Sequence, residues 1–206
     1  MKWNIPSFKR YSFSFSLFIF YKNEILSELS AMPLHLRRIL APKISKIFLS
    51  SGHIELAEAT IETVLRTTKS PTENIVLEEA SLLVATGDQA QAQDKLASIE
   101  SNSLATVEAF IKKTRLDLTS GAEISKQSYE LIQSYQVEYQ GTDIGTDLQI
   151  INVLALSKSR EYADAFDALE LLDTTNQASV KKTIHEDLVR FASDITFATH
   201  VFDHLD

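Results

Sequence analysis

Histidines near the carboxyl end have the clearest potential for chemistry in this sequence. His200 and His204 are four residues apart, so on one helix they would share a face, a spacing that can hold a metal ion. The pattern supplies no third ligand, and histidines near a helix carboxyl terminus are favoured by the helix dipole alone. His185, in TIHEDLVR, invites comparison with phosphate-accepting histidines of helical bundles, but the Lys and Gly that usually follow are absent. Surface histidines are the simpler interpretation, and we predict no metal site.

Carboxylates are the other abundant reactive groups, and pairs such as Glu55 with Glu58 and Glu78 with Glu79 are close in sequence. On helices this rich in Glu they are typical of solvated faces, and no acid–base pair stands out. The sequence has no Gly-rich phosphate loop, no Gly-x-Ser-x-Gly motif and no His-Glu-x-x-His motif. It also has no cysteine, so it can form neither a thiolate nucleophile nor a zinc–thiolate site. We predict a protein that is not an enzyme and uses no cofactor.

The composition favours one helical domain. The 206 residues are 44% hydrophobic and 23% charged, which is ordinary for a globular protein. Only 5 Gly and 4 Pro occur, too few for a turn-rich all-β chain, and strong helix formers dominate from residue 33 onward. The net charge of −8 argues against nucleic acid as a partner, because phosphate binding needs clustered Lys and Arg.

Residues 1–31 differ from the rest of the chain. MKWNIPSFKR is basic, YSFSFSLFIFY is apolar and aromatic, and SELSA ends in a small residue, which is loosely the pattern of a secretory signal. Glu24 and Glu28 lie where a neutral cleavage region is expected, and the apolar run is shorter than the roughly 20 residues that span a bilayer. An extra packed element and a true start at Met32 are the alternatives.

We therefore expect a leader over 1–31 and a single domain over 32–206. With a signal, the protein would be periplasmic or associated with the cell envelope; otherwise it would be cytoplasmic. Contact with a membrane is expected only through an uncleaved leader.

A helical hairpin is predicted after residue 33. In APKISKIFLSSG, Pro42 suits the start of a helix, and Ile44, Ile47 and Phe48 form one apolar face that ends at Gly52. HIELAEATIETVLRTT resumes at once with the same periodicity. Two helices joined so tightly are expected to be antiparallel neighbours.

A second hairpin repeats the first. SPTENIVLEEASLLVATG has Ser70 and Glu73 at the spacing of a capping box, and it ends at Gly87. Asp88 is expected to cap the next helix, QAQAQDKLASI. Gly tolerates the left-handed conformation that ends helices, and small residues let paired helices approach closely. Small residues recur at the same offsets from Gly52 and Gly87: Ser45 and Ala80 before them, Ala57 and Ala92 after them.

This spacing resembles the tetratricopeptide repeat, a helical hairpin of 34 residues. In that register two copies begin at Arg38 and Glu73, and a less regular third copy contains Gly121. QGTDIGTD is expected to be a loop, and the pattern returns in LSKSREYADAFDAL with Arg160 in place of the turn Gly. The resemblance implies a right-handed α-solenoid of about four antiparallel helix pairs.

The carboxyl-terminal tail is predicted to form a capping helix that covers the apolar end of the stack. Its sequence is SVKKTIHEDLVRFASDITFATHVFDHL.

The resemblance also implies a concave groove that binds a peptide or a partner protein. Its lining would be mixed but mostly apolar, which favours an amphipathic helix or an extended apolar peptide, although the same residues would also suit the core between helices. The Lys and Asn pattern that clamps a chain-terminal carboxylate in some members is missing. The implied groove residues are Lys46, Leu49, Asn74, Leu77, Ser81, Val84, Ile150, Leu154 and Lys158.

Three functions follow as expectations. The first is a non-catalytic interaction or scaffold module that binds a peptide or protein, at the bacterial cell envelope if residues 1–31 are a signal. The second is the solenoid part of a larger envelope enzyme or secretion assembly. The third is a helical metal- or phosphate-handling protein that uses His185, His200 or His204.

Overall fold

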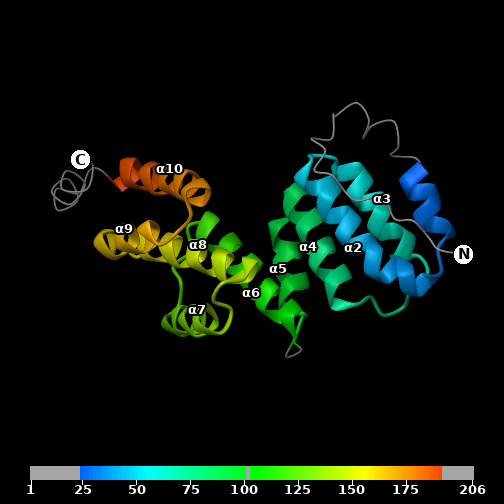
Figure 1. Cartoon of the computed structure of the whole chain (residues 1–206), viewed down its shortest axis with the longest axis horizontal. Coiled ribbons are helices and arrows are strands. Elements are labelled where there is room, and N and C mark those ends of the chain that lie inside the picture. The colour runs from blue at the N-terminus through cyan, green and yellow to red at the C-terminus, as the bar shows by residue number, and fades with distance from the viewer. Residues whose placement is uncertain (1–23, 101–102, 192–206) are drawn as a thin grey trace, which may run out of the picture. The chain divides into compact units, whose positions relative to one another are not determined.

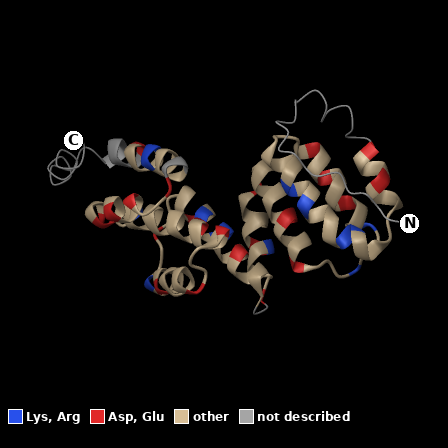
Figure 2. Cartoon of the chain, viewed as in Figure 1, with Lys and Arg blue, Asp and Glu red and all other residues tan. Residues whose placement is uncertain are grey.

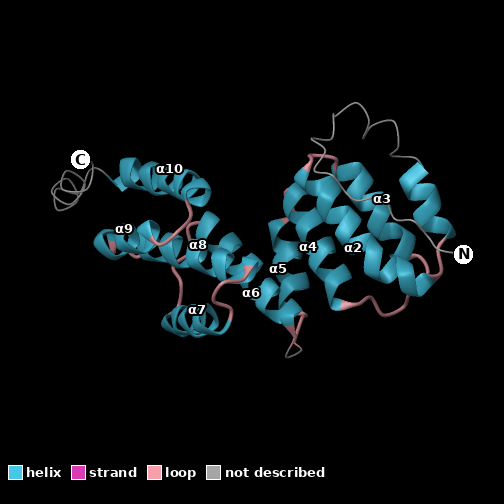
Figure 3. Ribbon diagram, viewed as in Figure 1, coloured by secondary structure: helices cyan, strands magenta, loops and turns pink. Residues whose placement is uncertain are grey.

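The computed structural model describes residues 24–100 and 103–191, and every regular element in these ranges is a helix (Figures 1 and 3). The all-α prediction is therefore confirmed for the described residues. The chain divides into two compact units, Met1–Asp88 and Gln89–Asp206. The predicted single domain over 32–206 stays a prediction, as does the leader over 1–31, of which 1–23 lie outside the described residues.

The first unit is built on a helical hairpin. Helix α2 (Leu34–Ser50) and helix α3 (Ile54–Leu65) pack together, and α4 (Glu73–Thr86) packs against both (Figure 1). Residues 24–31, which the sequence analysis grouped with the leader, are also helical, and Leu29 is only 1% exposed. The core of this unit consists of Leu29, Ala41, Phe48, Ala57, Ile61, Val64, Ile75 and Leu82.

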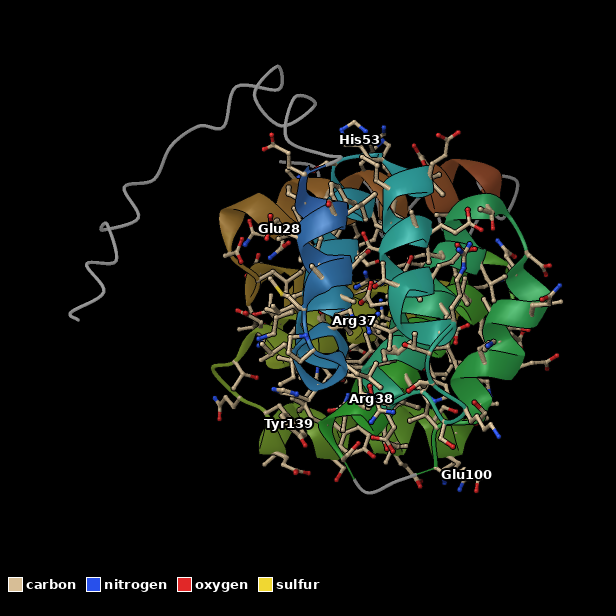
Figure 4. The ribbon with its side chains drawn as sticks, turned by 90° about the vertical axis from the view of Figure 1, so that its right-hand side faces the viewer. Glu28, Arg37, Arg38, His53, Glu100 and Tyr139 are labelled. Atoms are coloured by element: carbon tan, nitrogen blue, oxygen red, sulfur yellow. The ribbon has the colours of Figure 1, made fainter. Side chains whose placement is uncertain are left out.

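Small residues let α2 and α3 approach closely, as predicted. Ser45 and Ala57 are both fully buried, and the Ser45 hydroxyl donates to the Ala57 carbonyl oxygen over 3.3 Å. Two arginines of α2, labelled in Figure 4, form hydrogen bonds with residues at and just after the carboxyl-terminal end of α3. Arg37 Nη1 donates to the Thr63 carbonyl at 2.6 Å, and Arg38 Nη2 donates to the Thr68 hydroxyl.

Two predictions about helix starts in this unit are wrong. Pro42 lies inside α2, because the helix begins at Leu34 rather than next to the proline. Pro42 has no N–H, so the Arg38 carbonyl does not receive the usual bond from it. Ser70 and Glu73 form no capping box, because the N-cap of α4 is Thr72, which makes no side-chain capping hydrogen bond.

Helix α8 is the centre of the second unit. This unit contains α5 (Gln89–Ala97), α6 (Leu104–Thr119), α7 (Lys126–Glu138), α8 (Asp143–Lys158), α9 (Tyr162–Glu170) and α10 (Thr174–Phe191). Helix α8 packs against α6, α7, α9 and α10, and α5 packs against α6. The predicted final helix is confirmed as far as residue 191, and its Val180 and Ile184 are buried in a core with Val153 and Tyr162.

The start of α8 corrects the loop predicted for QGTDIGTD. Only its first three residues lie outside a helix, because α8 begins at Asp143. Thr142 caps the helix, and its hydroxyl oxygen accepts a hydrogen bond from the Gly145 N–H at 3.1 Å. Gly145 also lies so close to the preceding turn that a Cβ would collide with the Tyr139 carbonyl oxygen. Polar and glycine residues here start a helix instead of extending a loop.

Four helices, α2, α4, α6 and α8, end in the same capping motif. Their turn residues are Gly52, Gly87, Gly121 and Arg160, with φ of 77°, 90°, 83° and 65°. In each, the turn residue donates its N–H to the carbonyl three residues back, and the next residue donates to the carbonyl five back, over 2.8 to 3.2 Å. This is the Schellman arrangement, in which a left-handed residue satisfies the last carbonyls of a helix. Arg160 therefore takes the conformation of the turn Gly that it was predicted to replace.

Candidate functional site

The residues expected to line a family-type groove lie in both units. In the first unit Lys46 and Asn74 are exposed, Val84 is 38% exposed, and Leu77 is buried at 2%. Leu49 is half-buried and packs against the core, and the half-buried Ser81 donates its hydroxyl to the Leu77 carbonyl at 2.9 Å.

In the second unit Ile150, Leu154 and Lys158 are half-buried on α8. Ile150 and Leu154 pack against the core formed with α9 and α10. Ile150 and Leu154 thus contribute to packing within the second unit, and Leu77 is buried, which agrees with the alternative interpretation of these three positions as core. The groove that the family register implies stays a prediction.

A different hollow is present in the second unit, between α7, α8 and the end of α9. It has a volume of about 250 Å³. Most of its lining consists of side chains that carry a primary amide, and no charged side chain lines it. We call it the amide groove, and its residues are Gln133, Gln136, Val137, Gln140, Gln149, Asn152, Ala168 and Leu171.

Helix α7 supplies half of the amide groove because it has two different faces. Gln133, Gln136 and Val137 follow the spacing i, i+3, i+4, which places them on one face of α7, and Gln140 lies in the turn just after the helix. The face directed at the core carries aromatic and aliphatic residues at a similar spacing. Its residues are Tyr129, Ile132, Tyr135 and Tyr139.

The aromatic residues on the core face fix how α7 lies in the unit. Tyr135 makes edge-to-face contacts with Phe110 of α6 and with Tyr139, with ring centroids 5.8 and 6.2 Å apart. Ile132 is fully buried among residues of α6 and α8. These contacts hold the amide-bearing face of α7 toward α8.

The hydrogen bonds within the amide groove use only some of the donors and acceptors that its side-chain amides offer. Gln133 Nε2 donates to Asn152 Oδ1 at 2.8 Å, and Gln136 Nε2 donates to the Leu148 carbonyl at 3.2 Å. Each primary amide can donate twice and accept at its oxygen, so several donors and acceptors remain for a ligand. Among described residues, the side chains of Gln140 and Gln149 make no hydrogen bond.

Two exposed apolar side chains stand at the amide groove. Val137 is 79% exposed and Leu171 is 77% exposed, the two highest values among the exposed large hydrophobic residues that the structure describes. Isolated exposed apolar residues are common, but a pair that lines one hollow is typical of a binding surface.

Tyr129 lies at the edge of this region, beside Gln133. Burial of its ring, and then the nearby carboxylates of Glu161 and Asp164, raise the pKa of the Tyr129 phenol above its usual value of 10.0, against a hydrogen bond with Gln133 that lowers it. Tyr129 is therefore neutral at physiological pH. It adds no charge to the amide groove.

The histidines that suggested metal or phosphate chemistry do not meet in the described residues. His185 is exposed on α10, and His200 and His204 lie outside the described residues. No group of three metal-ligating side chains occurs among the side chains that the structure describes. A membrane-spanning helix is likewise not found in the part of the chain that the structure describes.

Sequence reasoning missed the amide groove, although one signal was present. Gln133, Gln136 and Gln140 recur at helical spacing in QSYELIQSYQVEYQ, which marks an uncharged polar face on an exposed helix. The contributions of α8 and α9 depend on tertiary packing, which no local pattern specifies. Comparisons of the chain with protein-family models, with curated proteins and with solved structures gave no match.

Proposed function

We propose that this protein is a non-catalytic interaction module that holds an extended segment of a partner protein in the amide groove. The observation that carries the proposal is the lining itself, in which five primary amides surround a hollow flanked by exposed Val137 and Leu171. Neither a nucleophile nor an acid–base pair lines this hollow. Its chemistry suits binding rather than reaction.

The amides match the polar groups of a peptide backbone. A peptide unit has one donor and one acceptor, and a Gln or Asn side chain offers both. Main-chain recognition of this kind gives affinity, while pockets for alternate side chains give specificity. At about 250 Å³ the amide groove holds only a few residues of a partner.

Val137 and Leu171 supply the apolar part of the contact. Both are more than three-quarters exposed, so covering them removes apolar surface from water. Because the lining carries no charge, binding should depend little on salt. The proposed ligand is therefore a neutral segment with at least two apolar side chains.

We further infer that the helices form a tetratricopeptide-like solenoid that α10 closes at one end. Support comes from the four identical capping motifs at Gly52, Gly87, Gly121 and Arg160, which end every second helix from α2 to α8. Buried alanines five residues after three of these turns add to it. On this proposal the partner segment lies in a surface built from repeated hairpins.

A displayed peptide library tests the proposed function. The full chain is used as bait, and we expect selection of neutral peptides with spaced apolar residues whose dissociation constants change little with salt. Replacing both Val137 and Leu171 with serine should raise the dissociation constants of the selected peptides at least about tenfold, because two apolar contacts are lost. The matched control is Leu104→Ser, which changes a leucine that is 51% exposed on α6. Selection of no peptide, or equal weakening by the control, would contradict the proposal.

A further inference from the structure

Helix α2 carries a surface of a different chemical kind. Its sequence, LHLRRILAPKISKIFLS, contains four Lys and Arg and no Asp or Glu. In Figure 2 this helix has blue segments and no red one. Such a helix stands out in a chain whose net charge is −8.

Residues 1–50 carry a net positive charge, whereas the rest of the sequence carries a net negative charge. Residues 1–50 contain eight Lys and Arg against two Glu, whereas residues 51–206 contain twelve Lys and Arg against twenty-six Asp and Glu. A charge asymmetry of this size between parts of a chain indicates contact with an anionic surface. Helix α2 is the basic part of residues 1–50 that the structure describes.

The two sides of α2 differ sharply in exposure. Ala41, Ser45 and Phe48 are buried at 0 to 1%. Ser45 bonds to Ala57 of α3, and Ala41 and Phe48 belong to the core of the first unit. The opposite side exposes aliphatic residues together with two lysines, and at 100° per residue these span only about 100° of the helix circumference. We call this surface the basic face, and it consists of Leu36, Ile39, Lys43, Lys46 and Ile47.

The apolar members of the basic face are well exposed. Leu36 is 39% exposed, Ile39 56% and Ile47 53%. From Leu36 to Ile47 the face extends about 16 Å along the helix. A convex helix face that mixes aliphatic and Lys side chains fits a flat surface that is both charged and apolar, which a lipid headgroup layer provides.

The two lysines are available for an anionic ligand, whereas the two arginines are not. Arg37 and Arg38 donate to Thr63 and Thr68, so they hold α2 to the rest of the hairpin. Lys43 and Lys46 are exposed, and neither makes an ion pair with a described residue. No carboxylate among the described residues therefore pairs with either lysine.

We propose that the basic face of α2 binds the surface of an anionic lipid bilayer. Lys43 and Lys46 contact lipid phosphates with their ammonium groups, while their aliphatic stems and the side chains of Ile39 and Ile47 enter the boundary between headgroups and acyl chains. Two lysines supply a modest attraction that salt screens, so binding is reversible. The contact is separate from the amide groove and does not depend on the proposed peptide ligand.

Vesicle flotation with the full chain tests this proposal. Vesicles of phosphatidylcholine mixed with phosphatidylglycerol are compared with vesicles of phosphatidylcholine alone. We expect the partition coefficient to be at least about tenfold higher on the anionic vesicles and to fall as salt is added. Equal partition onto both vesicles, or onto neither, would overturn the proposal; the second result is expected if the face instead docks on an acidic protein.

Variants separate the basic face from other positive charges. The Lys43→Glu, Lys46→Glu double variant should lose the anionic preference by about tenfold or more, because it reverses two charges at the surface. Lys113→Glu with Lys181→Glu changes the net charge by the same amount at exposed positions of the second unit and should bind as the wild type does. Ile39→Ser with Ile47→Ser should also weaken partition.

All of these positions are exposed, so circular dichroism and thermal melting should remain those of the wild type and exclude unfolding as the cause. If the Lys43, Lys46 variant still prefers anionic vesicles as strongly as the wild type, the proposal fails, because some other basic segment is then responsible. Peptide binding measured on the same variant should be unchanged, which keeps this test independent of the amide groove.

Discussion

At the scale of single residues, the left-handed conformation at four helix ends is the most regular feature of the chain. Glycine takes this conformation without strain, and three of the four positions are Gly52, Gly87 and Gly121. Arg160 takes it with φ of 65°, although a side chain with a Cβ costs about 1 kcal/mol or more there. The contacts that fix α8 and α9 must outweigh this local strain.

Substitution at Arg160 should reveal the stored strain. Arg160→Gly should raise the free energy of unfolding by about 1 kcal/mol relative to Arg160→Ala, because both remove the side chain and only Gly removes the strain. Denaturant unfolding of the two variants measures the difference. Equal stability of the two Arg160 variants would contradict this view of the turn.

Gly121→Ala should lower the free energy of unfolding by about 1 kcal/mol as well. No atom lies within 4 Å of the place that an added Cβ would occupy, so only the backbone conformation opposes the change.

At the scale of elements, buried small residues let neighbouring helices approach. Ala57 and Ala92 are fully buried in the helices that directly follow Gly52 and Gly87, and Ala165 in α9 is fully buried as well. These three alanines share the same offset from Gly52, Gly87 and Arg160. Large side chains at these places would force helices apart, because interiors are closely packed.

Two alanines of α9 allow this to be tested within one helix. Ala165→Leu should lower the free energy of unfolding by about 2 kcal/mol, because three added heavy atoms meet a packed interior. Ala163→Leu adds the same atoms at an exposed position and should change stability by less than about 0.5 kcal/mol. Thermal and denaturant melting provide both values. Similar losses for both variants would show that α9 is not packed as described.

A comparison of the predicted and observed elements shows which structural features are specified by local sequence alone. Turn residues and small residues were predicted because each has one strong local cause, either a positive φ or a close contact. The position of Pro42 was mispredicted because proline is usual in the first turn of a helix, yet α2 tolerates one in its interior. The loop after Tyr139 was mispredicted because Thr142 and Gly145 serve a helix start that needs the packing of α7 on α8. The amide groove depends on three helices at once, so its glutamines carried only a partial signal.

At the scale of the whole molecule, the two compact units present surfaces of different chemistry. The first unit exposes a basic and aliphatic helix face, and the second contains an uncharged hollow lined with amides. The two surfaces share no residue and come from separate units. A protein that contacts lipid through one unit and a partner segment through the other would act as an adaptor at a membrane surface.

The amide groove can be observed directly through its own side-chain amides. In the nitrogen-15 spectrum of the full chain, addition of a peptide selected by display should shift the side-chain NH₂ signals of Gln133, Gln136, Gln140, Gln149 and Asn152. Those of Gln89 and Gln93, which lie on α5 in the same unit, should stay in place. Shifts confined to other residues, with the five groove signals unmoved at saturation, would contradict the proposed function.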